Sequence, residues 1–219
     1  MRRIWRENGL TIVTLALFLL FVGGQTVAGW HEHNQDQEEH GQPTLDYVEY
    51  LGSGHSIEAL SENAESEFLQ MGLFVWLTTF LRQKGSPESK KLGPEEVDKD
   101  PRRDKQRGSP GPVQRGGVVL RIYENSLTLA FLVLFLVSFT LHAMSGAASY
   151  SEEQIAHGGA AVSAIQYLAT SRMWFESLQN WQSEMLSVLS LVVLSIFLRQ
   201  RGSPESKPVA APNSRTGSD

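Results

Sequence analysis

The sequence predicts an all-α fold, a four-helix transmembrane bundle made of two tandem, parallel-repeat helical hairpins. Three observations support this prediction: apolar residues gather in four blocks, basic residues cluster at one end of each block, and a motif recurs at a fixed interval. The blocks cover about residues 10–29, 68–81, 127–144 and 185–198, and strongly polar stretches separate them. Such segregation is typical of chains that cross a bilayer.

The first and third apolar blocks are long enough to cross a membrane without including a charged residue. Gly9–Gly29 and Asn125–Ser151 contain no Asp, Glu, Lys or Arg. Each meets the requirement of about 20 residues for a spanning helix. We therefore expect spans at about residues 9–29 and 125–145.

The second and fourth blocks are shorter, with 14 uncharged residues each, Phe68–Leu81 and Met185–Leu198. As α-helix such a stretch measures about 21 Å, whereas the hydrocarbon core is about 30 Å thick. These helices must begin earlier and bring polar residues into the membrane. We expect spans at about residues 63–82 and 180–199, which include Glu67 and Glu184.

The basic residues predict the orientation of the chain. Of 19 Lys and Arg residues, three precede the first block, eleven lie in Arg82–Arg121 and four follow the fourth block. Lys and Arg accumulate on the cytoplasmic side of membrane proteins. Both termini and the central linker are therefore expected in the cytoplasm, and the two remaining loops outside.

A motif repeats with an offset of 117 residues. Phe80–Lys90 reads FLRQKGSPESK and Phe197–Lys207 reads FLRQRGSPESK, with ten identities in eleven. Each copy contains two expected spans, so both hairpins enter and leave on the same side. The expected organisation is a first hairpin at 1–90, a flexible cytoplasmic linker at 91–117, a second hairpin at 118–207 and a disordered tail at 208–219.

The first block also has features of a cleaved signal peptide. Basic residues precede its apolar core, and the small residues Val27–Gly29 follow it. The repeat favours a retained helix, because the counterpart of this block near residue 140 lies inside the chain.

Four segments resemble a family of bacterial membrane proteins of unknown function. They are the start Arg6–Leu10, the glutamate-bearing stretch Asn180–Glu184 and the two exit motifs. The first copy differs from the pattern at Ala64, where the second copy has Trp181. The resemblance implies a location in the bacterial inner membrane and implies no activity.

Two glutamates form a candidate intramembrane polar site. If Arg82 marks the inner surface, Glu67 lies about 22 Å deeper, and Glu184 has the same position relative to Arg199. A carboxylate at that depth needs a partner, water or a proton. An ion or proton site is one interpretation. The other, which we favour, is interhelical packing or placement at the outer membrane interface. At similar depth, Gln25 is a candidate partner of Glu67, and His142 is a candidate partner of Glu184.

The exit motifs combine basic anchors with a turn that ends each helix. Their near identity, in contrast to the divergent loops, also suggests a cytoplasmic interaction motif. The candidate residues are Arg82, Ser86, Glu88, Arg199, Ser203 and Glu205.

Composition and motif searches exclude several classes of function. The chain has no cysteine, which excludes thiol chemistry and disulfides. The first outer loop is rich in His, Asp and Glu but has no ligand spacing of a closed metal site, and we expect no metal, cofactor, catalytic residue or nucleic-acid partner. The sequence therefore favours a non-enzymatic protein of the lipid bilayer that acts by assembly, either with itself or with an unidentified protein. The alternative is a small ion- or proton-coupled permeation protein that uses the glutamates.

Overall fold

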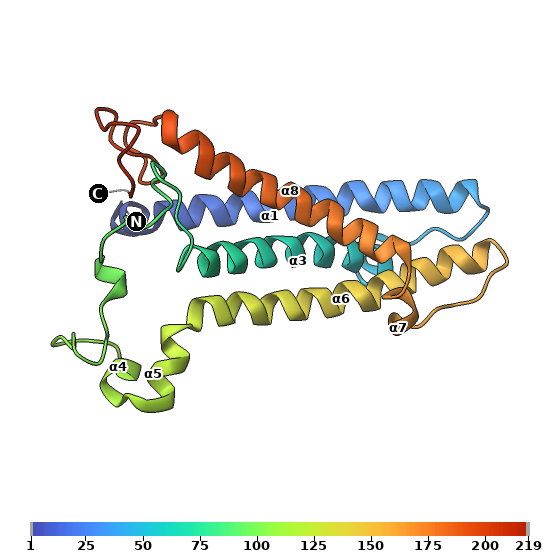
Figure 1. Cartoon of the computed structure of the whole chain (residues 1–219). Coiled ribbons are helices and arrows are strands. Elements are labelled where there is room, and N and C mark those ends of the chain that lie inside the picture. Colours follow the sequence, from blue (N-terminus) through green and yellow to red (C-terminus); the bar gives the residue numbers. More distant parts are fainter. Residues whose placement is uncertain (1, 218–219) are drawn as a thin grey trace. The chain divides into compact units, whose positions relative to one another are not determined.

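The computed structural model describes residues 2–217, and all regular secondary structure within them is helical (Figure 1). The prediction of an all-α fold is confirmed at this level. The long helices are α1 (Arg2–Glu39), α3 (Gly54–Leu77), α6 (Ser126–Ala156) and α8 (Ser171–Phe197). The short helices are α2 (Tyr47–Leu51), η1 (Glu96–Asp98), α4 (Gly111–Arg115), α5 (Gly117–Glu124) and α7 (Ala164–Tyr167).

Among the described residues, three helices are long and apolar enough to cross a membrane: α1, α6 and α8. At most 17% of the apolar stretch of any of them is buried within the protein. Lipid is the environment that suits so much exposed apolar surface. The fourth long helix, α3, is not among them because it carries four glutamates, and its span stays a prediction.

The chain forms two compact units. Unit 1 comprises residues up to Ser61 together with Thr140–Trp174, and unit 2 comprises Glu62–Phe139 together with residues from Phe175 onward. Three of the long helices, α3, α6 and α8, contribute residues to both units.

Two buried tyrosines occupy corresponding places in unit 1. Tyr50 and Tyr167 are 2% and 0% exposed, and each ring lies against a glycine, Gly29 and Gly146 respectively. A Cβ atom added at Gly146 would lie 2.5 Å from the Tyr167 ring, so a larger residue would displace the tyrosine. Each tyrosine and its glycine lie 117 residues from their counterparts.

The loops of unit 1 are closed by single polar side chains. Asn34 bonds both backbone groups of Leu45, at 2.8 and 2.9 Å. Ser151 does the same with Val162, at 3.2 and 2.9 Å. A polar side chain that satisfies both backbone groups fixes the return of the chain at that point. Both pairs of partners are again 117 residues apart.

The short helices that follow these loops begin alike. Asp46 caps α2 in a capping box with Glu49, and Ser163 caps α7 in a capping box with Gln166. Such boxes satisfy backbone donors that a helix start otherwise leaves unpaired. Two different side-chain pairs therefore provide the same local structure at positions 117 residues apart.

Candidate functional site

On α3, the buried glutamates differ from Glu67, the residue that its expected depth in the membrane selects. Glu65 is 0% exposed and Glu58 is 6% exposed, whereas Glu67 is exposed. Glu58, Glu62 and Glu65 follow the i, i+4, i+7 spacing of one helix face. Residue 67 lies two positions beyond Glu65 and therefore points away from that face.

In unit 2, α3 and α8 are joined by a polar seam, which we define as Glu62, Glu65, Ser177, Asn180 and Trp181. The Trp181 indole Nε1–H donates to the Glu65 carboxylate at 2.9 Å, and the Asn180 amide donates to Glu62. Ser177 lies one turn before them and is buried, and its Oγ has no hydrogen-bond partner within the described residues. In these two bonds the carboxylates thus accept from neutral donors and not from Lys or Arg.

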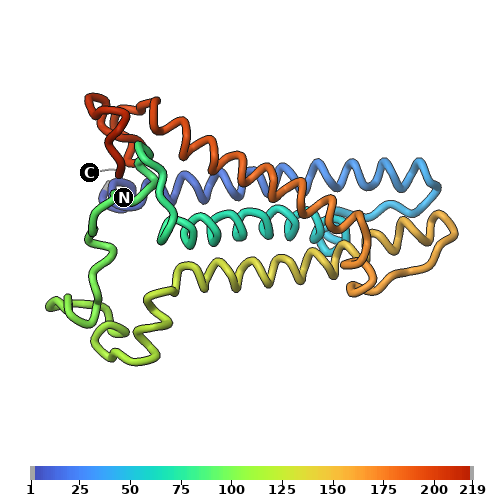
Figure 2. Tube along the Cα trace, in the orientation of Figure 1, coloured from blue at the N-terminus to red at the C-terminus, as the bar shows by residue number. Residues whose placement is uncertain are grey.

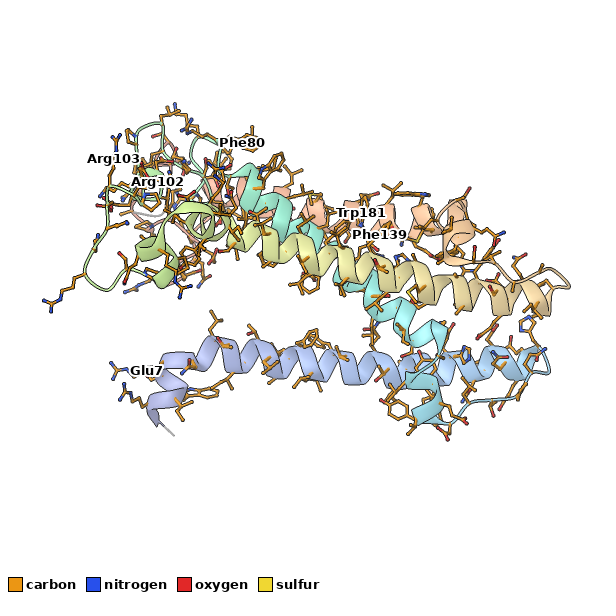
Figure 3. The ribbon with its side chains drawn as sticks, turned by 90° about the horizontal axis from the view of Figure 1, so that it is seen from below. Glu7, Phe80, Arg102, Arg103, Phe139 and Trp181 are labelled. Carbon is orange, nitrogen blue, oxygen red and sulfur yellow. The ribbon has the colours of Figure 1, made fainter. Side chains whose placement is uncertain are left out.

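Aromatic rings of α6 cover the seam. The Phe135 ring lies edge-on to the Trp181 ring at 6.2 Å, and it also contacts Phe139 at 5.8 Å. Figure 3 labels Trp181 on α8 and Phe139 on α6. Apolar rings beside a buried carboxylate lower the local dielectric and strengthen the hydrogen bond that it accepts.

The predicted pair Glu67 and Glu184 also lies in unit 2. Glu184 is partly buried on α8, and the two carboxylates are within electrostatic reach of each other. Their similar depth in a membrane stays a prediction. Neither residue forms the seam contact that buries Glu65.

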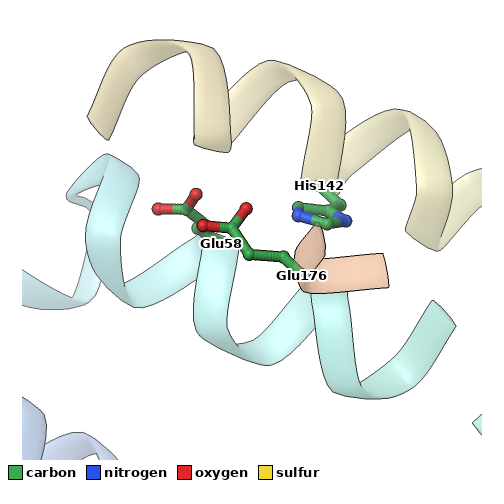
Figure 4. A group of neighbouring side chains, drawn as sticks. All are labelled: Glu58, His142 and Glu176. Carbon is green, nitrogen blue, oxygen red and sulfur yellow. The ribbon is translucent and has the colours of Figure 1, made fainter. Parts of the chain in front are cut away.

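A second buried polar group lies in unit 1. His142 is 0% exposed, and its ring lies edge-on to the Tyr167 ring at 6.4 Å. The Tyr167 hydroxyl donates to Glu58 at 3.1 Å. Figure 4 shows Glu58 on α3 and His142 on α6, whose nearest polar atoms lie within 4.8 Å of each other. Each buried polar side chain of this group thus has a polar or aromatic neighbour in unit 1.

The two predicted pairings stay predictions. Gln25 is exposed on α1 in unit 1, and its predicted partner Glu67 belongs to unit 2. His142 belongs to unit 1 and its predicted partner Glu184 to unit 2. Sequence reasoning missed the buried residues Glu58, Glu65 and Tyr167 and the partly buried Trp181. The helical spacing of the α3 glutamates is the signal that identifies the first two.

The two exit motifs form the same loop in unit 2. Gly85 and Gly202 both have positive φ, 89° and 87°, a conformation that favours glycine. The hydroxyl of Ser89 accepts a bond from the Gln83 backbone N–H at 2.8 Å. The equivalent bond in the second motif joins Ser206 to Gln200 at 2.9 Å. Much of the shared sequence is therefore explained by a shared loop structure.

The predicted interaction residues divide into buried and accessible groups. Ser86 is 0% exposed, and its Oγ accepts a bond from the backbone N–H of Glu88. Ser203 makes the same bond to Glu205 and is partly exposed. Ser86 therefore shapes its loop and cannot contact a partner directly. Arg82 and Glu205 are exposed and can.

The C-terminal segment packs on the first exit loop. Lys207 is 1% exposed, and its ammonium donates to the backbone carbonyls of Gly85, Asn213 and Arg215 at 2.6, 3.0 and 3.1 Å. Gly217 N–H also donates to the Ser86 carbonyl at 3.0 Å. Figure 2 shows the red C-terminal trace beside the green exit loop. We call residues 82–91 and 199–217 together the exit platform.

The platform brings two equivalent acidic residues near each other. Burial raises the pKa of the Glu88 carboxyl above its ordinary value, and the negative charge of Glu205 acts in the same direction. Glu88 and Glu205 occupy the same position in the two motifs. The two exit loops therefore meet in one charged surface.

The predicted disorder of residues 208–219 stays a prediction, and the structure gives contacts in the described part of this segment. Within 208–217, turns and hydrogen bonds to Lys207 and Arg199 define the course of the chain. Residues 218 and 219 lie outside the described part of the chain.

A family described as a domain of unknown function, DUF6766, matches residues 1–218. The chain belongs to this family. No curated protein and no solved structure matches the chain. The expected membership of a family of unknown function is therefore confirmed, and the family match gives no activity.

Proposed function

We propose that the protein is a non-enzymatic, multi-pass protein of the bacterial inner membrane that acts by assembly or by binding a protein partner. In this proposal four helices cross the membrane, two in each tandem hairpin, and both termini lie in the cytoplasm. Three long apolar helices support membrane insertion. Equivalent loop closures 117 residues apart support the duplication of one hairpin.

The exit platform is the observation that carries this proposal. Anchoring a helix end requires only basic residues and a turn, yet here a buried lysine ties the tail to the first exit loop. A preformed surface loses little conformational entropy when it binds. The exposed side chains of Arg82, Lys84 and Arg201 suit a partner with acidic residues.

The apolar stretches nearest the cytoplasm make the permeation alternative less favourable. Phe68–Leu81 and Met185–Leu198 carry no ionisable side chain, and each measures about 21 Å as helix. In the proposed topology, all the acidic residues of α3 and α8 lie beyond these stretches, toward the outer face. An ion or proton would therefore have to cross most of the hydrocarbon core without a carboxylate.

The topology can be tested by single-cysteine labelling, because the chain contains no cysteine. We expect Gln42→Cys and Ala161→Cys to react with an impermeant maleimide on intact spheroplasts. Lys84→Cys and Arg201→Cys should react only after permeabilisation. All four native side chains are exposed, whereas Ser86 is buried and is a poor position for a label. Labelling of Lys84→Cys from outside would exclude the four-span arrangement.

The interaction role can be tested by photo-crosslinking in native membranes. A photoreactive residue at Lys84 or Arg201 should give a discrete adduct, either to a second copy or to another protein. The same residue at Val48, exposed on α2 and expected outside, should not give that adduct. Lys207→Met should abolish the adduct because it frees the tail from the first loop. Absence of any adduct at both platform positions would contradict the proposal.

A further inference from the structure

We infer that unit 2 contains a binding site for one phospholipid, with an acyl chain in an apolar groove and the headgroup in a polar cavity. The groove lies between α3 and α6 and has a volume of about 190 Å³. The polar cavity, of about 540 Å³, lies just beyond α3 and is lined mainly by residues of the first exit motif and η1. All the residues that line the groove or the cavity belong to unit 2.

Gly72 creates the groove. Its backbone approaches α6 so closely that an added Cβ atom would lie 3.2 Å from the Cβ atom of Phe131. Glycine allows such an approach because it places no side chain between two helices. Large apolar side chains of both helices surround the position: Phe68, Leu69, Leu73 and Trp76 of α3 and Leu132 and Phe135 of α6. From residue 68 to residue 76 the groove extends about 12 Å along the helix, a length that suits part of an acyl chain.

The polar cavity begins where the groove ends. Trp76 is the last residue of α3 that lines the groove, and Thr78 and Thr79 line the cavity. The helical turn continues past this point, since the Leu81 N–H donates to the Leu77 carbonyl at 2.8 Å. Trp76 is 50% exposed, and tryptophan is enriched where a membrane meets water. An apolar groove followed at such a boundary by a polar cavity matches the order of tail and headgroup in a phospholipid.

The cavity carries charges of both signs. The ammonium groups are those of Lys90 and Lys91, and the carboxylates are those of Glu88, Glu95 and Asp98. Because the acidic residues outnumber the basic ones, a headgroup with only negative charge is disfavoured. A zwitterionic headgroup offers its phosphate to the lysines and its ammonium to the carboxylates. The site therefore fits a headgroup such as phosphoethanolamine.

The second hairpin provides a matched variant for the test. Leu189 lies 117 residues after Gly72, so Gly72→Leu copies the second hairpin and fills the groove. Gly24→Leu copies Leu141 in the same way. It serves as the control because an added Cβ atom at Gly24 meets nothing within 4 Å.

Native mass spectrometry of the full-length protein in detergent tests the inference. The probes are phosphatidylethanolamine and phosphatidylglycerol with identical acyl chains, added in equal amounts. We expect the protein to retain one phosphatidylethanolamine in preference to phosphatidylglycerol. Gly72→Leu should lose this lipid, and Gly24→Leu should keep it. The inference rests on the proposed topology, in which α3 crosses the membrane, and the cysteine-labelling experiment tests that topology separately.

Two further variants test the groove and the cavity one at a time. Trp76→Val copies Val193 of the second hairpin and changes a half-exposed side chain, so it decides the matter if Gly72→Leu fails to fold. It should also reduce the retained lipid. Glu95→Gln keeps an acceptor oxygen for the Lys91 backbone N–H but removes a charge. It should lower the preference for phosphatidylethanolamine about two- to fivefold, as expected for an exposed ion pair.

Glu96→Gln is the control for the cavity, because Glu96 is exposed and does not line it. This variant should leave the preference unchanged. Equal retention of the two lipids by the unsubstituted protein would overturn the inference. Undiminished retention in folded Gly72→Leu or in Trp76→Val would do the same, as would a second copy of the chain that binds in place of lipid and is lost in Gly72→Leu.

Discussion

Trp181→Ala is expected to lower the free energy of unfolding by about 3 kcal/mol, the lower end of the range for replacing a packed tryptophan with alanine. The lower end applies because Trp181 is only partly buried on α8. The substitution removes the ring that packs against Phe135 and the N–H that donates to the fully buried Glu65. Unfolding in mixed detergent and SDS micelles, followed by circular dichroism, measures the change.

Two substitutions divide this effect between packing and hydrogen bonding. Trp181→Phe keeps an aromatic ring and removes the N–H, and interhelical hydrogen bonds in membranes contribute about 0.6 kcal/mol on average. It should therefore cost much less than Trp181→Ala. Glu65→Gln keeps an acceptor oxygen for Trp181 and should be nearly neutral if the seam packs the helices.

Glu67, the exposed carboxylate two residues after Glu65 on α3, supplies the control. Glu67→Gln, alone or together with Glu184→Gln, should change stability little, because Glu67 is exposed and Glu184 only partly buried. A loss of stability in Glu67→Gln as large as that in Trp181→Ala would show that the wrong carboxylate has been assigned to the helix contact. A well-folded Glu65→Gln that has lost the cellular phenotype would favour an ion or proton site.

The difference between Glu65 and Glu67 shows what the sequence can predict about α3. Counting residues from Arg82 gives depth along the helix axis, since each residue adds about 1.5 Å. Depth does not say which face of the helix packs against a neighbour. That face depends on α8, whose Trp181 and Asn180 reach Glu65 and Glu62 across more than 100 residues of sequence.

The structure of the exit motifs could be predicted from the sequence only in part. Their glycine and serine positions are determined by local turn chemistry, which near-identical sequences repeat. Nothing within the motif marks Lys207, its last residue, as buried, because all three acceptors of its ammonium lie outside the motif and one of them, Gly85, is 122 residues away. Its sequence counterpart Lys90 instead pairs with Asp98 of η1 and is partly exposed. Two lysines at the same place in a repeated motif thus have different partners, which the motif alone does not show.

Lys207→Met is expected to release the C-terminal segment from the exit platform. Methionine keeps most of the apolar stem and volume of lysine, but it removes the ammonium that bonds three backbone carbonyls. Hydrogen bonds to a charged group contribute about 1.5–3 kcal/mol each, so their combined loss should open the segment locally. We expect faster amide hydrogen exchange across residues 208–217 and faster tryptic cleavage after Arg215, with the helices unaffected.

Lys84→Met removes an exposed ammonium from the same loop as Gly85 and should change neither rate. Equal exchange protection in Lys207→Met and the unsubstituted protein would show that other contacts hold the tail, and the exit platform would then lose its role as the preformed surface on which the proposed interaction depends.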